Sequence, residues 1–200
     1  MSEPHHAAHE AAEHTEHEGH GSTNRKIALL IAVLALFLAF SETLGKSAQT
    51  ESISLNIEAS DTWNFFQAKT IRQTTSRAAA EGLTAHASAV TDPALKAAMQ
   101  KQAEAWQATV ARYESDPKEK DGRKELRAKA EHYEHQRNTQ LARYHHYEVA
   151  SAAFQIAIVL ASAMIITGMA VLAYLAGGLG ILGLVFMGIA IWAPHAVHIV

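Results

Sequence analysis

The sequence predicts an all-α membrane protein with three transmembrane helices and a coiled-coil-like helical hairpin between the first and the second. Three observations support this fold class. An apolar segment, Ile27–Phe40, follows Arg25 and Lys26. The last 52 residues, Val149–Val200, contain no Asp, Glu, Lys or Arg, and at about 20 residues per crossing they are long enough to span a bilayer twice. The charged region between these segments, residues 46–148, contains no convincing strand pattern.

The composition of the chain excludes some function classes. The formal net charge is −3, from 17 Lys and Arg residues and 20 Asp and Glu residues. This balance offers no basic stripe for nucleic acid, so we expect no nucleic-acid partner. Cysteine is absent, which excludes disulfides and thiolate metal sites. The sequence has no Walker loop, nucleophile elbow or zinc-protease motif. We therefore expect a non-enzymatic protein without a bound cofactor.

Residues 1–25 are rich in His and Glu, and we predict that they form a disordered tail. They lack the branched and aromatic side chains whose burial would offset the entropy of ordering. The tail holds six of the 13 histidines, and His14, His17 and His20 lie three apart beside glutamates. Neutral imidazole binds Zn²⁺, Ni²⁺ and Cu²⁺, so these three residues are candidate ligands for weak metal binding. The alternative is a solvated tail whose charge changes near a pH of about 6.5.

Residues 26–45 are predicted to form the first transmembrane helix. Extended to Leu44, the apolar segment reaches the lower limit of a membrane-spanning length. A cleaved signal peptide, cut near residues 39–41, is the alternative, but its N-terminal region would be unusually long and acidic. Glu42 is the carboxylate closest to a span, and we expect it to reach the membrane interface from its position near the helix end.

Residues 46–148 are predicted to form a charged, coiled-coil-like helical domain. Two Asp-Pro pairs divide it, because Asp caps a helix end and Pro suits the first helical position. The expected helices cover residues 51–90, residues 93–114 and the chain from about residue 118 onward. No turn signal precedes Val149, so the third helix is expected to continue into the apolar segment.

Side chains in the second and third of these helices recur at steps close to three and four, the spacing of paired helices. In the second helix they are Leu95, Met99, Gln102, Trp106, Val110 and Tyr113. In the third helix they are Leu126, Ala130, Tyr133, Arg137, Tyr144, Tyr147 and Ser151.

Residues 149–176 and 178–194 are predicted to form the second and third transmembrane helices, followed by a short tail at 195–200. The division falls in the glycine-rich sequence AGGLGILG, where a re-entrant hairpin is an alternative. Small residues at four-residue spacing would let helices approach closely. These pairs are Ala157 and Ala161, Ala173 and Gly177, and Ala176 and Gly180. Basic residues flank the spans on both sides, so the positive-inside rule leaves the orientation open.

The sequence SLNIEASDTWNFFQAKTIRQ carries the pattern Asn-x-x-Ala-x-Asp-x-Trp-x-x-aromatic-Gln-Ala-Lys. The matching residues are Asn56, Ala59, Asp61, Trp63, Phe66, Gln67, Ala68 and Lys69. With one membrane helix before it and a charged helical stretch and a hydrophobic pair after it, the chain resembles a bacterial family known as domain of unknown function 4337. The resemblance covers about Lys26 to the C-terminus. It implies a bacterial membrane protein with a coiled-coil-like soluble part, and it implies no activity and no catalytic residue.

The same stretch divides into two faces on a helical wheel at about 100° per residue. Trp63, Phe66, Ile57 and Ile71 share one half, which we expect to pack against neighbouring helices. Phe65 lies in the charged half, which also carries Glu58, Asp61, Lys69 and Arg72. An isolated exposed Phe is ordinary, whereas an aromatic side chain among charges also suits a subunit interface. The candidate interaction residues are Asp61, Trp63, Phe65, Phe66, Lys69 and Arg72, with Glu58 beside them.

The sequence therefore predicts a multi-pass protein of the bacterial inner membrane that acts as an assembly or interaction module. We expect its partners to be the lipid bilayer, further copies of the chain and another membrane protein complex. The alternative is a metal- or proton-handling accessory protein that uses the His-rich tail and Glu42.

Overall fold

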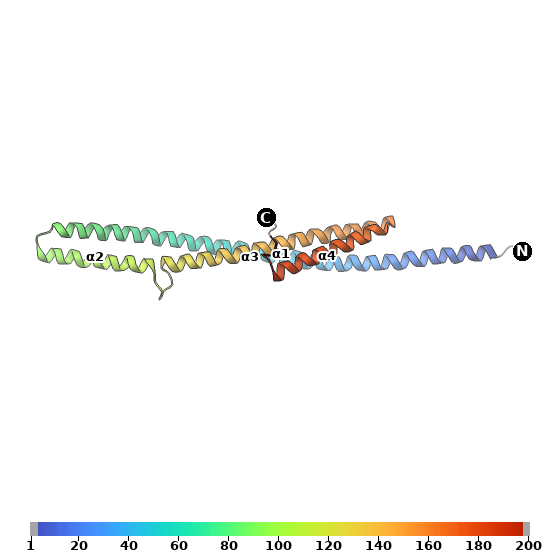
Figure 1. Cartoon of the computed structure of the whole chain (residues 1–200), viewed down its shortest axis with the longest axis horizontal. Helices are drawn as coiled ribbons and strands as arrows, with labels where there is room; N and C mark the ends of the chain where they lie inside the picture. The colour runs from blue at the N-terminus through green and yellow to red at the C-terminus, as the bar shows by residue number, and fades with distance from the viewer. Residues whose placement is uncertain (1–3, 198–200) are drawn as a thin grey trace. The chain divides into compact units, whose positions relative to one another are not determined.

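The computed structural model describes the backbone of residues 4–197 and the side chains of residues 24–197. The described chain contains four helices and no strand: α1 (Pro4–Ala89), α2 (Pro93–Glu114), α3 (Arg123–Thr167) and α4 (Ala170–Trp192) (Figure 1). The expected all-α fold is confirmed. The candidate ligands His14, His17 and His20 lie outside the residues whose side chains are described. The structure differs from the prediction of a disordered tail, because α1 begins at Pro4 and the backbone of residues 4–25 is helical.

The chain divides into two compact units, which we describe separately. The hairpin unit consists of residues 51–138 and the apolar unit of residues 1–50 and 139–200. In the hairpin unit, α1 ends at Ala89 and α2 begins at Pro93, as the sequence predicts. The Asp92 carboxylate accepts a hydrogen bond from the Ala94 amide (2.9 Å) and caps α2.

The third helix begins at Arg123, so the prediction of a start near residue 118 was wrong. The second Asp-Pro pair initiates a single turn, in which the Lys120 amide donates to the Asp116 carbonyl (2.7 Å). Lys120 then adopts a left-handed conformation (φ 58°), which ends the turn. A Cβ atom at Gly122 would lie 2.7 Å from the Ser115 Cα, so the chain needs glycine there to enter α3.

The buried side of α1 in the hairpin unit follows a heptad spacing, and most of its side chains are small or polar. We call this set the buried stripe. Its members are Ser52, Leu55, Ala59, Thr62, Lys69, Gln73, Ala80 and Ala87. Ala103 of α2 and Leu126 and Ala130 of α3 are buried in the same unit. Small side chains let helix axes approach, so this pairing depends less on large apolar groups than a typical coiled coil does.

The buried positions of α3 follow the predicted spacing better than those of α2. Leu126 and Ala130 are buried as expected. In α2, Gln102 and Leu95 are exposed, and Ala103 occupies the buried position beside Gln102. The reason is that small Ala103 fits close to the neighbouring backbone, whereas the polar Gln102 remains in water.

In the apolar unit, α3 continues without a break through Val149 to Thr167, which confirms the predicted continuous helix. The predicted division of the last two helices at residues 176–178 was wrong. The break lies at Gly168, whose φ of 69° ends α3, and α4 begins two residues later at Ala170. The glycine-rich sequence lies inside α4, where Ala176, Gly180 and Gly183 are buried.

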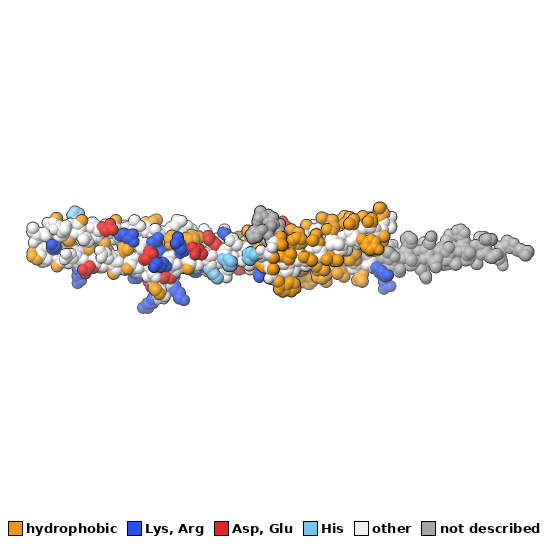
Figure 2. All heavy atoms as spheres, in the orientation of Figure 1, with side chains coloured by type: hydrophobic (Ala, Val, Ile, Leu, Met, Phe, Trp, Pro, Cys, Tyr) orange, Lys and Arg blue, Asp and Glu red, His pale blue; other side chains and the backbone are white. Residues whose placement is uncertain are grey.

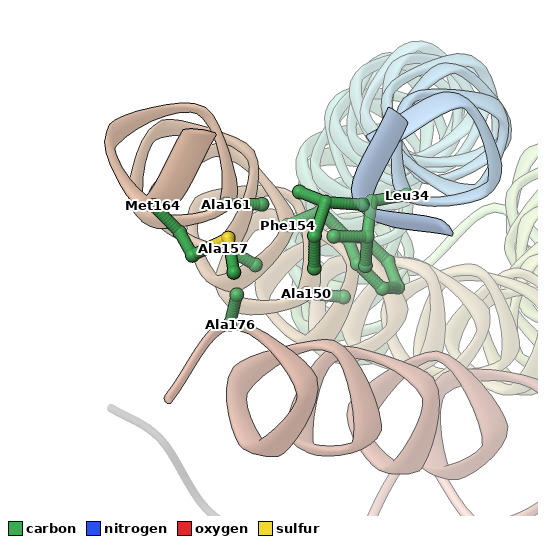
Figure 3. Close-up of a cluster of buried hydrophobic side chains, with 8 residues drawn as sticks. Leu34, Ala150, Phe154, Ala157, Ala161, Met164 and Ala176 are labelled. Atoms are coloured by element: carbon green, nitrogen blue, oxygen red, sulfur yellow. The ribbon is translucent and has the colours of Figure 1, made fainter. Parts of the chain in front are cut away.

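The core of the apolar unit joins α1, α3 and α4 (Figure 3). Phe154 of α3 is completely buried, and Leu34 of α1 and Ala176 of α4 belong to the same cluster. A Cβ atom at Gly183 would lie 2.7 Å from the Phe154 ring, and one at Gly180 would lie 2.8 Å from the Leu34 Cδ2. Glycine therefore gives room to the buried Phe154 ring where α4 passes it, whereas the end of the flexible Leu34 side chain can shift to admit a Cβ atom at Gly180. Ala157, Ala161, Ala176 and Gly180 are buried, as expected for small residues at helix contacts.

On the face shown in Figure 2, hydrophobic side chains gather over α4 and the C-terminal half of α3. Among the described residues, three helices are long and apolar enough to cross a membrane: α1 from Asn24, α3 and α4.

Tyr174 and Trp192, near the two ends of α4, are 81% and 83% exposed. They lie 18 positions apart, which is about 27 Å along a helix and close to the thickness of about 30 Å of a hydrocarbon core. Tyr and Trp at this separation are typical of the two membrane interfaces.

Replacing Gly183 with alanine tests the packing of α4 against α3. Because the added Cβ would overlap the fully buried Phe154 ring, we expect Gly183→Ala to destabilise the detergent-solubilised protein by about 1–3 kcal/mol. Gly178→Ala is the matched control, since nothing lies within 4 Å of the new Cβ and alanine favours a helix. Thermal unfolding followed by circular dichroism measures both. Equal midpoints for the two variants would contradict this packing.

Candidate functional site

The densest group of polar contacts in the hairpin unit surrounds Arg123, at the start of α3. Its Nε donates to the Thr70 Oγ1 (2.9 Å). Its Nη1 donates to the Gln73 Oε1 (2.6 Å) and to the Glu114 Oε2 (2.8 Å). The guanidinium also lies over the Phe66 ring, 5.1 Å from the centroid. One side chain of α3 thus contacts two turns of α1 and the last residue of α2.

Gln73 occupies the buried stripe of α1 and is only 2% exposed. Its Nε2 donates to the Glu114 Oε2 (2.9 Å) and to the Val110 carbonyl (3.3 Å), and its Oε1 accepts from Arg123. A buried amide without partners would be costly, and here both ends are satisfied. The hydrogen bond from Gln73, helped by the charge of Arg123, holds the pKa of Glu114 below its usual value. Glu114 is therefore ionised at neutral pH and acts as an acceptor for both partners.

Lys69 forms a second polar contact one helical turn before Gln73. Its Nζ lies 2.7 Å from the Asp121 Oδ2, and the residue is 8% exposed. The same ammonium lies over the rings of Phe65 (5.3 Å) and Tyr113 (5.2 Å). Burying a lysine is unfavourable unless a carboxylate compensates its charge, and Asp121 does so here.

Two further contacts join α1 to α3 nearer the start of the hairpin. The Trp63 Nε1 donates to the Glu134 Oε1 (2.9 Å), and the Arg137 Nη1 donates to the Asn56 Oδ1 (3.0 Å). Trp63 also packs edge-on against Phe66, with ring centroids 5.4 Å apart. We call the contacts made by Asn56, Trp63, Lys69 and Gln73 with their partners in α2, in α3 and in the loop between them the polar cluster.

The structure separates the six candidate interaction residues into two groups. Trp63, Phe66 and Lys69 face the other helices of the hairpin and belong to or flank the polar cluster. The expectation that Lys69 lies on an outer charged face was wrong, because Asp121 draws it into the hairpin. The other three residues are exposed; they are Asp61, Phe65 and Arg72.

Ile57 and Ile71 were expected on the packing face and are instead 55% and 67% exposed. The helical wheel placed the centre of that face at Trp63. The buried stripe instead runs through Leu55, Ala59 and Thr62, and Ile57 and Ile71 project from the opposite side of the helix, more than about 100° away.

The structure shows few contacts at the other candidate sites, the metal-binding histidines and Glu42. Among the described residues, no group of three or more His, Cys, Asp or Glu side chains is arranged to hold a metal ion. Glu42 accepts a hydrogen bond from the Gln155 Nε2 (3.1 Å). His146 of α3 is 1% exposed, and its Nε2 lies 3.0 Å from the Pro194 carbonyl oxygen. It is buried because it lies on the side of α3 that faces the C-terminal end of α4.

Sequence reasoning did not find Gln73, Glu114, Asp121, Arg123 and Glu134. A signal was present for Gln73, because it continues the spacing of Leu55, Ala59 and Thr62 along α1, but a polar residue at such a position is ordinarily solvated. The partners of Gln73 come from distant parts of the chain, so nothing local indicates them.

The family model described as domain of unknown function 4337 matches residues 23–193, most of the chain. The chain belongs to this family. No curated protein and no solved structure matches it. In this DUF4337 protein, five of the eight residues of the sequence pattern contribute to hairpin packing: Asn56, Ala59, Trp63, Phe66 and Lys69. Asp61 and Gln67 are exposed, and Ala68 makes no polar contact. The DUF4337 pattern here therefore describes mainly how the hairpin is held together.

Arg123→Ala tests the polar cluster. It removes the donor to Thr70, Gln73 and Glu114, so we expect a loss of about 1–3 kcal/mol in unfolding free energy. Arg127→Ala is the control, because Arg127 makes an exposed ion pair with Glu131 at 3.8 Å, worth about 0–1 kcal/mol, and lies farther from the Phe66 ring centroid (6.0 Å) than Arg123 does. Chemical denaturation followed by Trp fluorescence compares them. A larger loss for Arg127→Ala would be inconsistent with the contacts described.

Proposed function

We propose that the protein is a non-enzymatic integral membrane protein that acts as an oligomeric assembly and interaction module. Its place is the inner membrane of a bacterium, crossed by the apolar segments of α1, α3 and α4. The observation that carries the proposal is a row of exposed apolar side chains on α1, on the side facing away from the buried stripe.

This row, which we call the outer patch, is defined by four large apolar side chains and two charged ones. The apolar members are Ile53, Ile57, Phe65 and Ile71, which are 57%, 55%, 42% and 67% exposed. The charged members are Asp61 and Arg72. A single exposed isoleucine is ordinary, but three on one side of a charged helix, with an aromatic residue beside them, indicate a contact surface.

The polar cluster explains why the outer patch suits binding. Lys69 and Gln73 are fixed by Asp121, Arg123 and Glu114 on the inner side of α1, so the outer side is carried by a helix that needs no further packing to stay ordered. A preorganised surface loses less conformational entropy on binding than a flexible one. Burying one isoleucine contributes about 1.5–3 kcal/mol.

A second copy of the chain is the partner that the outer patch fits best. Asp61 and Arg72 give the patch both signs of charge, so it can complement a copy of itself. Copies anchored in the same bilayer also meet at a high effective concentration, which lets a modest patch support association. The assembled hairpins would then present a common surface to another membrane protein complex.

The alternative function is metal or proton handling by the His-rich tail and Glu42. The detergent-solubilised protein distinguishes the two functions by its oligomeric state and its metal content. Assembly through α1 gives discrete oligomers that are insensitive to a chelator. A metal-handling protein would carry bound metal, and deletion of the tail would change metal uptake.

Self-association in detergent tests the assembly proposal. We expect Ile71→Ser and Phe65→Ala each to weaken oligomerisation by about tenfold, because each removes an exposed apolar side chain from the outer patch. Leu95→Ser is the matched control, since Leu95 is 52% exposed on α2 and outside the patch. Light scattering coupled to size-exclusion chromatography measures the oligomer. Trp63→Ala, in contrast, is expected to lower the unfolding midpoint by removing the contact with Glu134.

Helical content must stay at the wild-type level in the Phe65 and Ile71 variants for the comparison to hold. An unchanged oligomer in both variants, or an equal effect of Leu95→Ser, would contradict the proposal.

A further inference from the structure

Glu42 of α1 and Gln155 of α3 form a polar pair on the exposed surface of the apolar unit. The Gln155 Nε2 donates to the Glu42 Oε1 at 3.1 Å, and both side chains are exposed. Exposed side chains close to Gln155 on α3 are apolar, including Ile156 (53% exposed) and Val159 (66%).

The pair lies within the part of α3 that carries no charge. The last charged residue of α3 is Glu148, and Gln155 follows seven positions later, about 10 Å along the helix. The Glu42 side chain tilts toward the apolar part of α1. Side chains on a helix tilt toward its N-terminus, and the apolar part of α1 precedes Glu42. The Ser41 hydroxyl donates to the Tyr147 carbonyl (2.9 Å), which holds α1 and α3 in this register.

The pair leaves hydrogen-bonding groups without partners among residues 24–197. Glu42 uses one carboxylate oxygen, and Gln155 uses one of its two amide N–H groups and leaves its carbonyl oxygen unused. Lipid tails offer no partner to these groups, and an ionisable side chain exposed to hydrocarbon is unfavourable. A protein surface with matching donors and acceptors lowers the cost of the unpaired hydrogen-bonding groups.

We propose that the Glu42–Gln155 pair is the contact point between two copies of the chain inside the bilayer. This inference rests on the proposed assembly function and assigns it an intramembrane site distinct from the outer patch. The pair offers both an amide donor and a carboxylate acceptor, so two copies related by a twofold axis along the membrane normal complement each other. The free N–H of Gln155 in each copy donates to Glu42 of the other, beside the exposed apolar side chains of Ile156 and Val159.

Site-directed crosslinking tests the contact, because the chain has no native cysteine. Ala152 lies one turn before Gln155 on the same face of α3 and is exposed. In liposomes, Ala152→Cys is expected to give a dimer with a short bis-maleimide. Val185→Cys is the matched control, since Val185 is 52% exposed in the charge-free segment but on α4. We expect it to crosslink at the level of random collision.

Second substitutions in the Ala152→Cys background connect the crosslink to the pair. Glu42→Leu and Gln155→Leu are expected to reduce the crosslinked dimer about 3- to 10-fold, the range for hydrogen bonds between membrane helices. Glu42→Gln, which still accepts and donates hydrogen bonds, is expected to keep it. Circular dichroism confirms that each variant retains its helices.

Equal crosslinking of Ala152→Cys and Val185→Cys, or a crosslink that survives both leucine substitutions, would overturn the inference. If this happens while Ile71→Ser still weakens the oligomer, the assembly function stands and only the intramembrane site is wrong. A wild-type protein that is monomeric in both assays would overturn both.

Discussion

The hairpin depends on one constraint: its buried stripe carries a lysine and a glutamine that must find partners within the fold. Lys69 and Gln73 cannot be left unpaired in the helix contact without a penalty of about 1–3 kcal/mol or more each, and Asp121, Arg123 and Glu114 supply the partners. Apolar stripes can slide by a turn and still bury the same kind of surface. A stripe with two specific polar partners cannot, so the register of α1 against α2 and α3 follows from these contacts.

In the apolar unit, small residues allow the helices to pack closely. Gly183 gives space to the Phe154 ring, and Ala157, Ala161 and Ala176 are completely buried. Helices in lipid gain little from the hydrophobic effect when they associate, so close packing supplies the attraction. Each unit therefore uses its large apolar side chains mostly on the outside, where lipid or another protein can cover them. The proposed assembly surfaces are a consequence of this distribution.

The sequence predicted the helices and most of their ends correctly, because caps and apolar segments are visible in short stretches of sequence. Pro93 and the Asp92 cap placed α2 correctly, and the charge-free segment indicated two of the helices that are long and apolar enough to cross a membrane. The sequence failed where a distant contact decided the outcome. Gly168, and not the AGGLG sequence, ends α3, and of the later glycines Gly180 and Gly183 serve packing. Lys69 looked solvated because its partner is 52 residues away. Polar partners between helices leave no local pattern, so the candidate site could be found only in part.

A double-mutant cycle on Lys69 and Asp121 tests the central claim that polar contacts within one chain fix the hairpin. The unfolding free energy is measured for the wild type, Lys69→Met, Asp121→Asn and the double variant. The two side chains meet at 2.7 Å, so we predict a coupling energy of about 1–3 kcal/mol, with the double variant more stable than the sum of the single losses implies. Additive losses, within about 0.5 kcal/mol, would show that the pair does not hold α1 in place.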